Sequence, residues 1–173
     1  MSLEFKSQVG ENQGCAVILA GSDSDKSHID NLVKSLREYE IPFEVRICSA
    51  HKQPDKLLDI LREYDSLNGG LVYIAVAGGT DALSGTISFQ SSRPVISSPP
   101  DHFNQSCVNN PAGSSNAYIG RPVNVARFIA QMFSYTNPDY RKKIVGSITS
   151  KIEELNGTDN TLRLEYQRKN EPW

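Results

Sequence analysis

Two short apolar runs constrain the fold of this chain more than any other feature. Residues 15–20 (Cys-Ala-Val-Ile-Leu-Ala) end at Gly21, and residues 71–77 (Leu-Val-Tyr-Ile-Ala-Val-Ala) end at the pair Gly78-Gly79. Continuous apolar runs of this length are typical of strands that are buried on both faces of a sheet. The two runs therefore predict a central sheet that is covered on both sides.

The segments between and after these runs alternate between strand and helix patterns. Residues 26–40 place Ile29, Leu32 and Leu36 on one helical stripe, and Pro42 ends that helix. Helices are predicted over residues 26–40, 54–66, a short stretch ending near residue 90, 122–133 and 138–155, and further strands over 43–47, 94–97 and 118–119. Strands that alternate with helices imply right-handed crossovers. We therefore predict an α/β fold, a three-layer α/β/α sandwich around a parallel sheet.

The chain length of 173 residues suits one domain. We expect this domain to span residues 15–155, with polar terminal tails at 1–14 and 157–173. Residues 101–116 show little periodicity and contain Asn, Ser, Pro and Gly, which is typical of a long functional loop. We expect His102, in that loop, at the surface and His28, on the first long helix, to be solvated.

Composition excludes several classes of function. The net charge of −2 argues against sequence-independent binding of nucleic acid, which needs a basic face. No apolar run approaches the ~20 residues of a membrane span, and the N-terminal residues lack an apolar signal core, so we expect a cytoplasmic protein. Cys15, Cys48 and Cys107 form no CxxC pair or zinc pattern and are predicted to be buried, reduced thiols. No HExxH motif or His-Cys cluster indicates a metal site.

The first run is followed by a polar turn, Gly21-Ser22-Asp23-Ser24-Asp25. Ser22 and Ser24 offer hydroxyl groups, and the helix that begins near Asp25 offers free N–H groups, so this turn predicts an anion site. The Asp25 carboxylate could accept hydrogen bonds from a ribose. The alternative is that Ser24 or Asp25 only caps the helix.

A second polar turn, Ser49-Ala50-His51-Lys52-Gln53-Pro54, follows the next predicted strand. A histidine titrates near pH ~6.5 and can give or take a proton at neutral pH. Lys52 brings a positive charge that suits a phosphate. Together they indicate proton transfer on a phosphorylated substrate. The alternative is a histidine that only hydrogen-bonds its own turn.

The third turn, Gly78 to Gly85, follows the second apolar run. Its glycines allow the backbone to approach a planar ligand closely, although simple loop flexibility would explain them equally well. In an open parallel sheet, ligands bind beyond the carboxyl ends of the strands. We therefore expect the three turns to lie at one edge and to share one ligand.

Four motifs carry a resemblance to a known family. Gly-Ser-x-Ser-Asp, Ser-Ala-His-Lys-x-Pro, Ala-Gly-Gly-(x)₃-Leu-x-Gly and Pro-Val-Ile-x-x-Pro-Pro occur in order at residues 21–25, 49–54, 77–85 and 94–100. Over about residues 15–155 the chain resembles the PurE family of purine biosynthesis. The resemblance implies a flavodoxin-like fold and a homo-octamer with its sites at subunit contacts. It also implies action on 5-aminoimidazole ribonucleotide (AIR) without a metal or organic cofactor.

The resemblance also implies roles for individual residues. His51 matches the acid/base histidine of the family, and Ser22, Asp25 and Lys52 match nucleotide-binding positions. The full set expected to bind the substrate is Gly21, Ser22, Ser24, Asp25, Ser49, Lys52, Gly78, Gly79, Leu83 and Ser84.

The family has two branches, and this chain resembles the one that adds CO₂ directly to C4 of AIR. Lys52 stands where the mutase branch has arginine, and Ala82 stands where that branch usually has histidine. However, the carboxylase branch usually reads Gly-Arg-Ser-Asn where this chain has Gly78-Gly79-Thr80-Asp81, so a cation is missing and Asp81 adds a negative charge.

We therefore predict a carboxylase of AIR in the synthesis of inosine monophosphate, with CO₂ as co-substrate. Three alternatives stay open. The first is a mutase that moves a carboxylate from N5 to C4 of N5-carboxy-AIR. The second is a nucleotide-binding homologue without catalysis, and the third is a flavin-binding protein of flavodoxin-like fold.

Overall fold

A sheet of five parallel strands, in the order β2-β1-β3-β4-β5, forms the centre of the molecule. The computed structural model describes residues 1–11, 13–101 and 103–169, so His102 and residues 170–173 of the predicted tail lie outside the described residues. The strands are β1 (Cys15–Ala20), β2 (Phe43–Ile47), β3 (Leu71–Val76), β4 (Val95–Ser97) and β5 (Ala117–Tyr118). The α-helices are α1 (Leu3–Gly10), α2 (Lys26–Glu38), α3 (Pro54–Asp65), α4 (Leu83–Gln90), α5 (Pro122–Phe133) and α6 (Pro138–Lys169), and the short 3-10 helices are η1 (Asp23–Asp25) and η2 (Gln105–Cys107). The predicted parallel sheet is confirmed.

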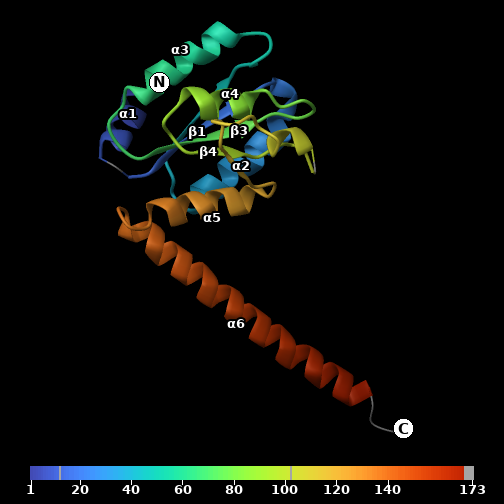
Figure 1. The fold of residues 1–173 in the computed structure, drawn as a ribbon. Helices are drawn as coiled ribbons and strands as arrows, with labels where there is room; N and C mark the ends of the chain where they lie inside the picture. The colour runs from blue at the N-terminus through green and yellow to red at the C-terminus, as the bar shows by residue number, and fades with distance from the viewer. Residues whose placement is uncertain (12, 102, 170–173) are drawn as a thin grey trace.

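Strands β1 and β3 are buried along their whole length. Alternate side chains of β1 enter two separate cores: Ile18 packs with α2, α5 and the start of α6, whereas Val17 packs with α1, α3 and α4. Figure 1 shows these two groups of helices on opposite faces of the sheet. The three-layer α/β/α architecture follows from this alternation, as predicted.

The N-terminal residues form helix α1 rather than the predicted polar tail. Phe5 and Val9 are buried in the core beneath α3, and the Phe5 ring meets the Tyr64 ring edge-on with centroids 6.1 Å apart. The prediction missed this helix because two apolar residues four apart are its main apolar signal in a polar segment. Their spacing places both on one helical face, which is enough to dock a short helix.

Helix α6 continues through Lys169, beyond its predicted end at residue 155. Its first turns join the core, where Ile144 is buried and the Tyr140 hydroxyl donates to the carbonyl oxygen of Gly14 at 2.8 Å. The side chains of residues 151–167 are all exposed, and Figure 1 shows this part of α6 projecting away from the sheet. Among the described residues, no helix is both long and apolar enough to cross a membrane.

The three cysteines are buried and unpaired, as predicted. Burial raises the pKa of Cys15 and of Cys107 to about 12, and it also raises the pKa of Cys48. Because the thiolate is the reactive form of cysteine, these residues are inert packing groups.

The contact between α1 and Gly69 gives a direct test of this packing. Gly69 has φ +142°, and a Cβ built on it would lie 1.8 Å from the carbonyl oxygen of Val9. We expect Gly69→Ala to lower the free energy of unfolding by roughly 1–3 kcal/mol, measured by urea denaturation. The matched control is Gly10→Ala, since a Cβ on Gly10 would meet nothing within 4 Å. Equal stability of the two variants would contradict the docking of α1.

Candidate active site

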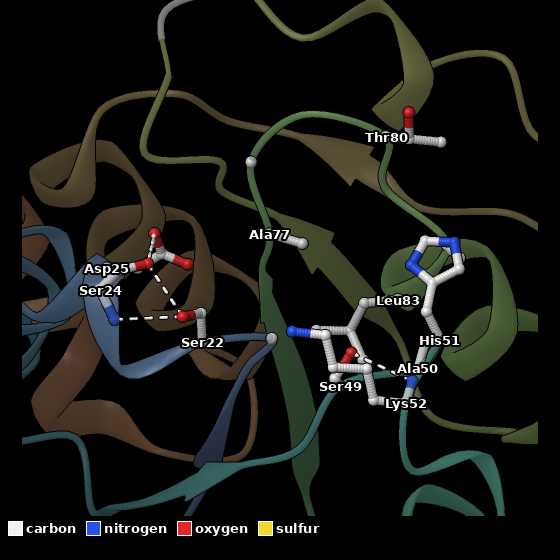
Figure 2. A pocket seen from close by; sticks show the side chains of 13 residues that line it. Ser22, Ser24, Asp25, Ser49, Ala50, His51, Lys52, Ala77, Thr80 and Leu83 are labelled. Carbon is white, nitrogen blue, oxygen red and sulfur yellow. Dashed lines mark hydrogen bonds between the residues drawn. The ribbon is translucent and has the colours of Figure 1, made fainter.

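The three polar turns meet in one cavity of about 330 Å³ beyond the carboxyl ends of β1, β2 and β3. The chain leaves β1 for β2 on one side and reaches β3 on the other, so the cavity lies at the switch point of the sheet. The lining residues are Gly21, Ser22, Ser24, Asp25, Ser49, Ala50, His51, Lys52, Ala77, Gly78, Thr80, Ala82 and Leu83. The structure thus brings most of the predicted substrate-binding residues together (Figure 2).

The first turn is organised by its two serines. Ser22 has an extended backbone, and its Oγ accepts the backbone N–H of Ser24 at 3.2 Å and the Ser24 hydroxyl at 2.9 Å. Ser22 therefore caps η1. Asp25 precedes α2, but its side chain makes no capping hydrogen bond. The alternative that Asp25 only caps the helix is not supported, because its carboxylate makes no capping bond, accepts the Ser24 hydroxyl at 3.3 Å and lines the cavity, where it can accept hydrogen bonds from a ligand.

The second turn presents both of its ionisable side chains to the cavity. Its backbone is closed by Gln53 N–H, which donates to the Ser49 carbonyl at 2.8 Å, and by Lys52 N–H, which donates to Ser49 Oγ at 3.3 Å. His51 and Lys52 are exposed. In Figure 2 the Lys52 amino group points toward the first turn, while the His51 ring points away from it. The cation therefore lies on the side where Ser22 and Ser24 offer hydroxyls.

Two of the four residues predicted in the third turn line the cavity. Gly78 and Leu83 line the cavity, but Gly79 and Ser84 do not. The N–H of Gly79 donates to Asp101 at 3.0 Å, and its carbonyl accepts from Asn104 and Ser106. Ser84 is fully buried. The structure gives these two residues partners in the protein instead of a place in the cavity wall.

Four lining residues escaped the sequence-based prediction: Ala50, Ala77, Thr80 and Ala82. Each lies within or beside a predicted turn, so proximity in the chain was the available signal. Among the described residues, no group of three or more His, Cys, Asp or Glu side chains could hold a metal ion. The side chains that line the cavity carry hydroxyls, a carboxylate, an imidazole and an ammonium group.

Comparison with known families agrees with this geometry. The family described as AIR carboxylase matches residues 15–154, a range that contains the whole sheet and all three turns. The chain belongs to the AIR carboxylase family. The predicted membership of the PurE family is thereby confirmed.

Individual relatives within the AIR carboxylase family are similar over most of the chain. The phosphoribosylaminoimidazole carboxylase of Archaeoglobus fulgidus is 34% identical over 154 residues, which are 86% of this chain and 84% of that protein. A human bifunctional phosphoribosylaminoimidazole carboxylase/phosphoribosylaminoimidazole succinocarboxamide synthetase is 35% identical over 159 residues, 88% of this chain but 37% of the human protein. A probable N5-carboxyaminoimidazole ribonucleotide mutase of Methanobrevibacter smithii is 29% identical over 178 residues, 90% of this chain and 52% of that protein.

A solved member of the family has the same fold. The crystal structure of Treponema denticola PurE matches with a TM-score of 0.82 and 28% sequence identity, covering 86% of this chain and 98% of that one. The predicted flavodoxin-like α/β fold is therefore confirmed.

Asp81 is one of the positions where this chain departs from the carboxylase branch of the family. Its side chain is bonded to α4 and does not line the cavity. Its Oδ1 accepts the N–H groups of Leu83 at 2.8 Å and Ser84 at 3.0 Å, and its Oδ2 accepts the Ser84 hydroxyl. Asp81 therefore caps the N-terminus of α4, where the helix dipole also favours a negative charge. The Asp81 carboxylate is therefore bonded to α4 and is not among the groups that line the cavity.

Gly79, the other departure from that branch, occupies a backbone conformation that suits glycine. Its φ is +63°, and a Cβ built on it would meet nothing within 4 Å. Any other residue would be strained at this φ, and glycine supplies no cation there. Lys52 is the cation that lines the cavity.

His28 is only partly exposed and has a partner in the protein, whereas it was predicted to be solvated. Its Nε2 lies 3.0 Å from the hydroxyl oxygen of Ser98, and the residue is half-buried. Burial lowers the pKa of His28, with smaller opposing contributions from Ser98 and Asp25. The prediction failed because Ser98 follows a different strand, 70 residues away in the sequence.

The capping role of Asp81 can be tested by substitution. We expect Asp81→Ala to lower the free energy of unfolding by about 0.5–2 kcal/mol, because the N–H groups of Leu83 and Ser84 lose their acceptor. Urea denaturation measures this change. Asp81→Asn is the matched control, since an asparagine Oδ1 can still accept at a helix N-terminus. If Asp81→Ala were as stable as the unaltered protein, the capping role would be wrong.

Proposed function

We propose that this protein carboxylates AIR at C4 with CO₂ to give 4-carboxy-AIR in purine biosynthesis. Membership of the AIR carboxylase family, together with one cavity that holds His51, Lys52 and Asp25, is the observation that carries this proposal. The carboxylase name of the Archaeoglobus relative supports the direct reaction with CO₂. The reaction as proposed uses residues of the chain without a metal or organic cofactor.

The geometry suits a ribonucleotide that lies across the cavity. Its phosphate would lie at the first turn, where Ser22 and Ser24 offer hydroxyls and Lys52 offers a positive charge. Its ribose hydroxyls would donate to the Asp25 carboxylate. Its imidazole would then lie toward His51, against the backbone of Gly78. This placement puts the anion at one end of the cavity and the reacting ring at the other.

His51 would remove the proton that carboxylation releases. The C4–C5 double bond of the aminoimidazole supplies the electron pair that forms the new bond from C4 to the carbon of CO₂, and one oxygen of CO₂ takes the negative charge. The ring then holds a C4–H bond and a positive charge shared with its amino nitrogen. Transfer of the C4 proton to a neutral His51 returns the bond electrons to the ring and restores aromaticity.

The mutase reaction is the second candidate. It is favoured by the absence of an arginine at Gly79 and by the mutase name of the Methanobrevibacter relative. The two reactions are distinguished by supplying AIR with bicarbonate in one assay and N5-carboxy-AIR in the other, and following 4-carboxy-AIR by absorbance. Product from AIR supports the carboxylase. Product from N5-carboxy-AIR alone would establish the mutase, and ribonucleotide binding by calorimetry with neither substrate turned over would indicate a binding protein.

Substitution of His51 tests its role in proton transfer. We expect His51→Asn to reduce kcat by at least about 100-fold, because an amide cannot take the C4 proton. Its melting temperature should stay unchanged, since His51 is exposed. The control is Gln53→Ala, in the same turn but outside the cavity lining. Full activity of His51→Asn would reject the assignment.

We also propose that the chain assembles as a homo-octamer. The resemblance suggested this state, and the exposed apolar side chains of α6 support contacts between copies. Val145, Ile148, Ile152 and Leu155 recur at intervals of three and four residues, which places them on one side of the helix, and all four are exposed. A continuous apolar stripe of this kind is typical of a surface that another protein segment covers.

Light scattering after size-exclusion chromatography tests the assembly. We expect a mass of eight times the 19.1 kDa chain, and we expect Ile152→Glu to lower it because a charge would be buried in the contact. Ser150→Glu is the control, since residue 150 lies on the opposite side of α6. A monomeric protein would refute the octamer. An unaltered mass for Ile152→Glu would show that α6 takes no part in the contacts between subunits.

We place this function in the cytoplasm. The three cysteines are free, and unpaired thiols are usual in the reducing cytosol.

A further inference from the structure

The contact between His28 and Ser98 joins two elements that carry opposite sides of the candidate site. His28 lies in the first turn of α2, and its Nε2 is 3.0 Å from Ser98 Oγ. Ser98 is fully buried, and its N–H donates to the carbonyl of Ala75 at 2.9 Å. The serine is therefore fixed to the edge of β3, and the histidine ring bridges from α2 to that fixed point.

On the α2 side, His28 lies three residues after Asp25. Residues three apart lie on the same face of a helix, so the His28 side chain and the Asp25 end of η1 face the same region of the molecule. A hydrogen bond at His28 therefore restrains the segment that carries Ser24 and Asp25 into the cavity.

On the other side, Ser98 is followed in the chain by residues 99–101, which contact the third turn. Pro99 and Pro100 follow it and restrict the backbone. Asp101 then accepts the Gly79 N–H at 3.0 Å. Gly78 lies against the same segment, since a Cβ built on it would be 3.4 Å from Pro100 Cγ and from Asp101 Oδ1. The position of Ser98 therefore constrains the backbone of Gly78 and Gly79.

We propose that His28 is a positioning residue for the ribonucleotide, which sets the separation between the Ser22–Asp25 turn and the Ala77–Gly79 turn through its hydrogen bond to Ser98. This inference rests on the proposed function. The phosphate and ribose contact the first turn and the imidazole contacts the third, so a ligand that spans both turns depends on their separation. His28 is not among the residues that line the cavity.

This role predicts an effect on substrate binding rather than on the chemical step. His28→Leu keeps a side chain of similar bulk but has no group to bond Ser98. We expect it to raise the KM for AIR about fivefold to tenfold, with kcat within about threefold of the unaltered enzyme. His28→Gln should return KM to within about threefold of the original value, because the glutamine amide reaches about as far as the histidine Nε2.

Ser98→Ala tests the same bond from the other end. It should raise KM as His28→Leu does, and the double variant His28→Leu/Ser98→Ala should be no worse than either single variant, because both remove one interaction. Since Ser98→Ala only deletes a hydroxyl, it keeps the test valid if His28→Leu fails to fold. Isothermal titration of each variant with AIR gives the same comparison as a dissociation constant, independently of turnover.

The possible results separate this inference from the function on which it rests. If the unaltered protein neither binds nor carboxylates AIR, both proposals are overturned. If the unaltered protein binds AIR and all variants bind it equally well, the positioning role alone is overturned. A lower melting temperature and a smaller active fraction at unchanged KM would also overturn it, because that pattern shows a bond that serves folding only. Weakened binding in His28→Leu and Ser98→Ala with recovery in His28→Gln establishes it.

Discussion

Burial of β1 and β3 on both faces is the constraint on which the rest of the structure depends. Side chains of each strand alternate between two cores, and the connections from β1 to β4 pass over the sheet as helices α2, α3 and α4, whereas β4 reaches β5 through a loop that contains η2. Every strand consequently ends at the same edge. The polar turns lie there because the chain leaves the core at that edge, and the switch point between β1 and β3 separates them enough to leave a cavity.

The third turn is shaped by residues that come much later in the chain. Asp101 and Asn104 bond the backbone of Gly79, and Ser106 bonds both Gly79 and Asp81. The loop after β4 therefore decides which parts of this turn face the cavity. The contacts of this loop also hold Gly79 and Asp81, the two departures from the carboxylase branch, outside the wall of the cavity.

Regular periodicity made most of the fold predictable. The predicted helix at residues 54–66 is found as Pro54–Asp65, and that at 122–133 is found unchanged, since each combines an apolar stripe with proline at its first turn. The meeting of the three turns was also predictable, because parallel strands share an edge. The ends of the chain were not, since α1 has two buried apolar residues and the side chains of residues 151–167 of α6 are exposed.

The details of the site were less predictable because they depend on contacts between distant residues. Ser84 was expected to bind substrate, but it is turned inward by Asp81. His28 was expected in solvent, but it bonds Ser98. In both cases the local sequence identifies a polar side chain on a helix, and only the packing of neighbouring elements determines its direction. The residues that face the cavity were predicted better, since a turn at a strand end has few other orientations.

Folding of the outer half of α6 depends on the surface that this helix contacts. Residues 156–161 (Asn-Gly-Thr-Asp-Asn-Thr) are poor helix formers, and their side chains are all exposed. A helix of this composition gains its stability from the surface that it covers rather than from its own backbone. In an assembly of copies, ordering of this segment and association of the subunits become one equilibrium, so its helicity is a function of protein concentration.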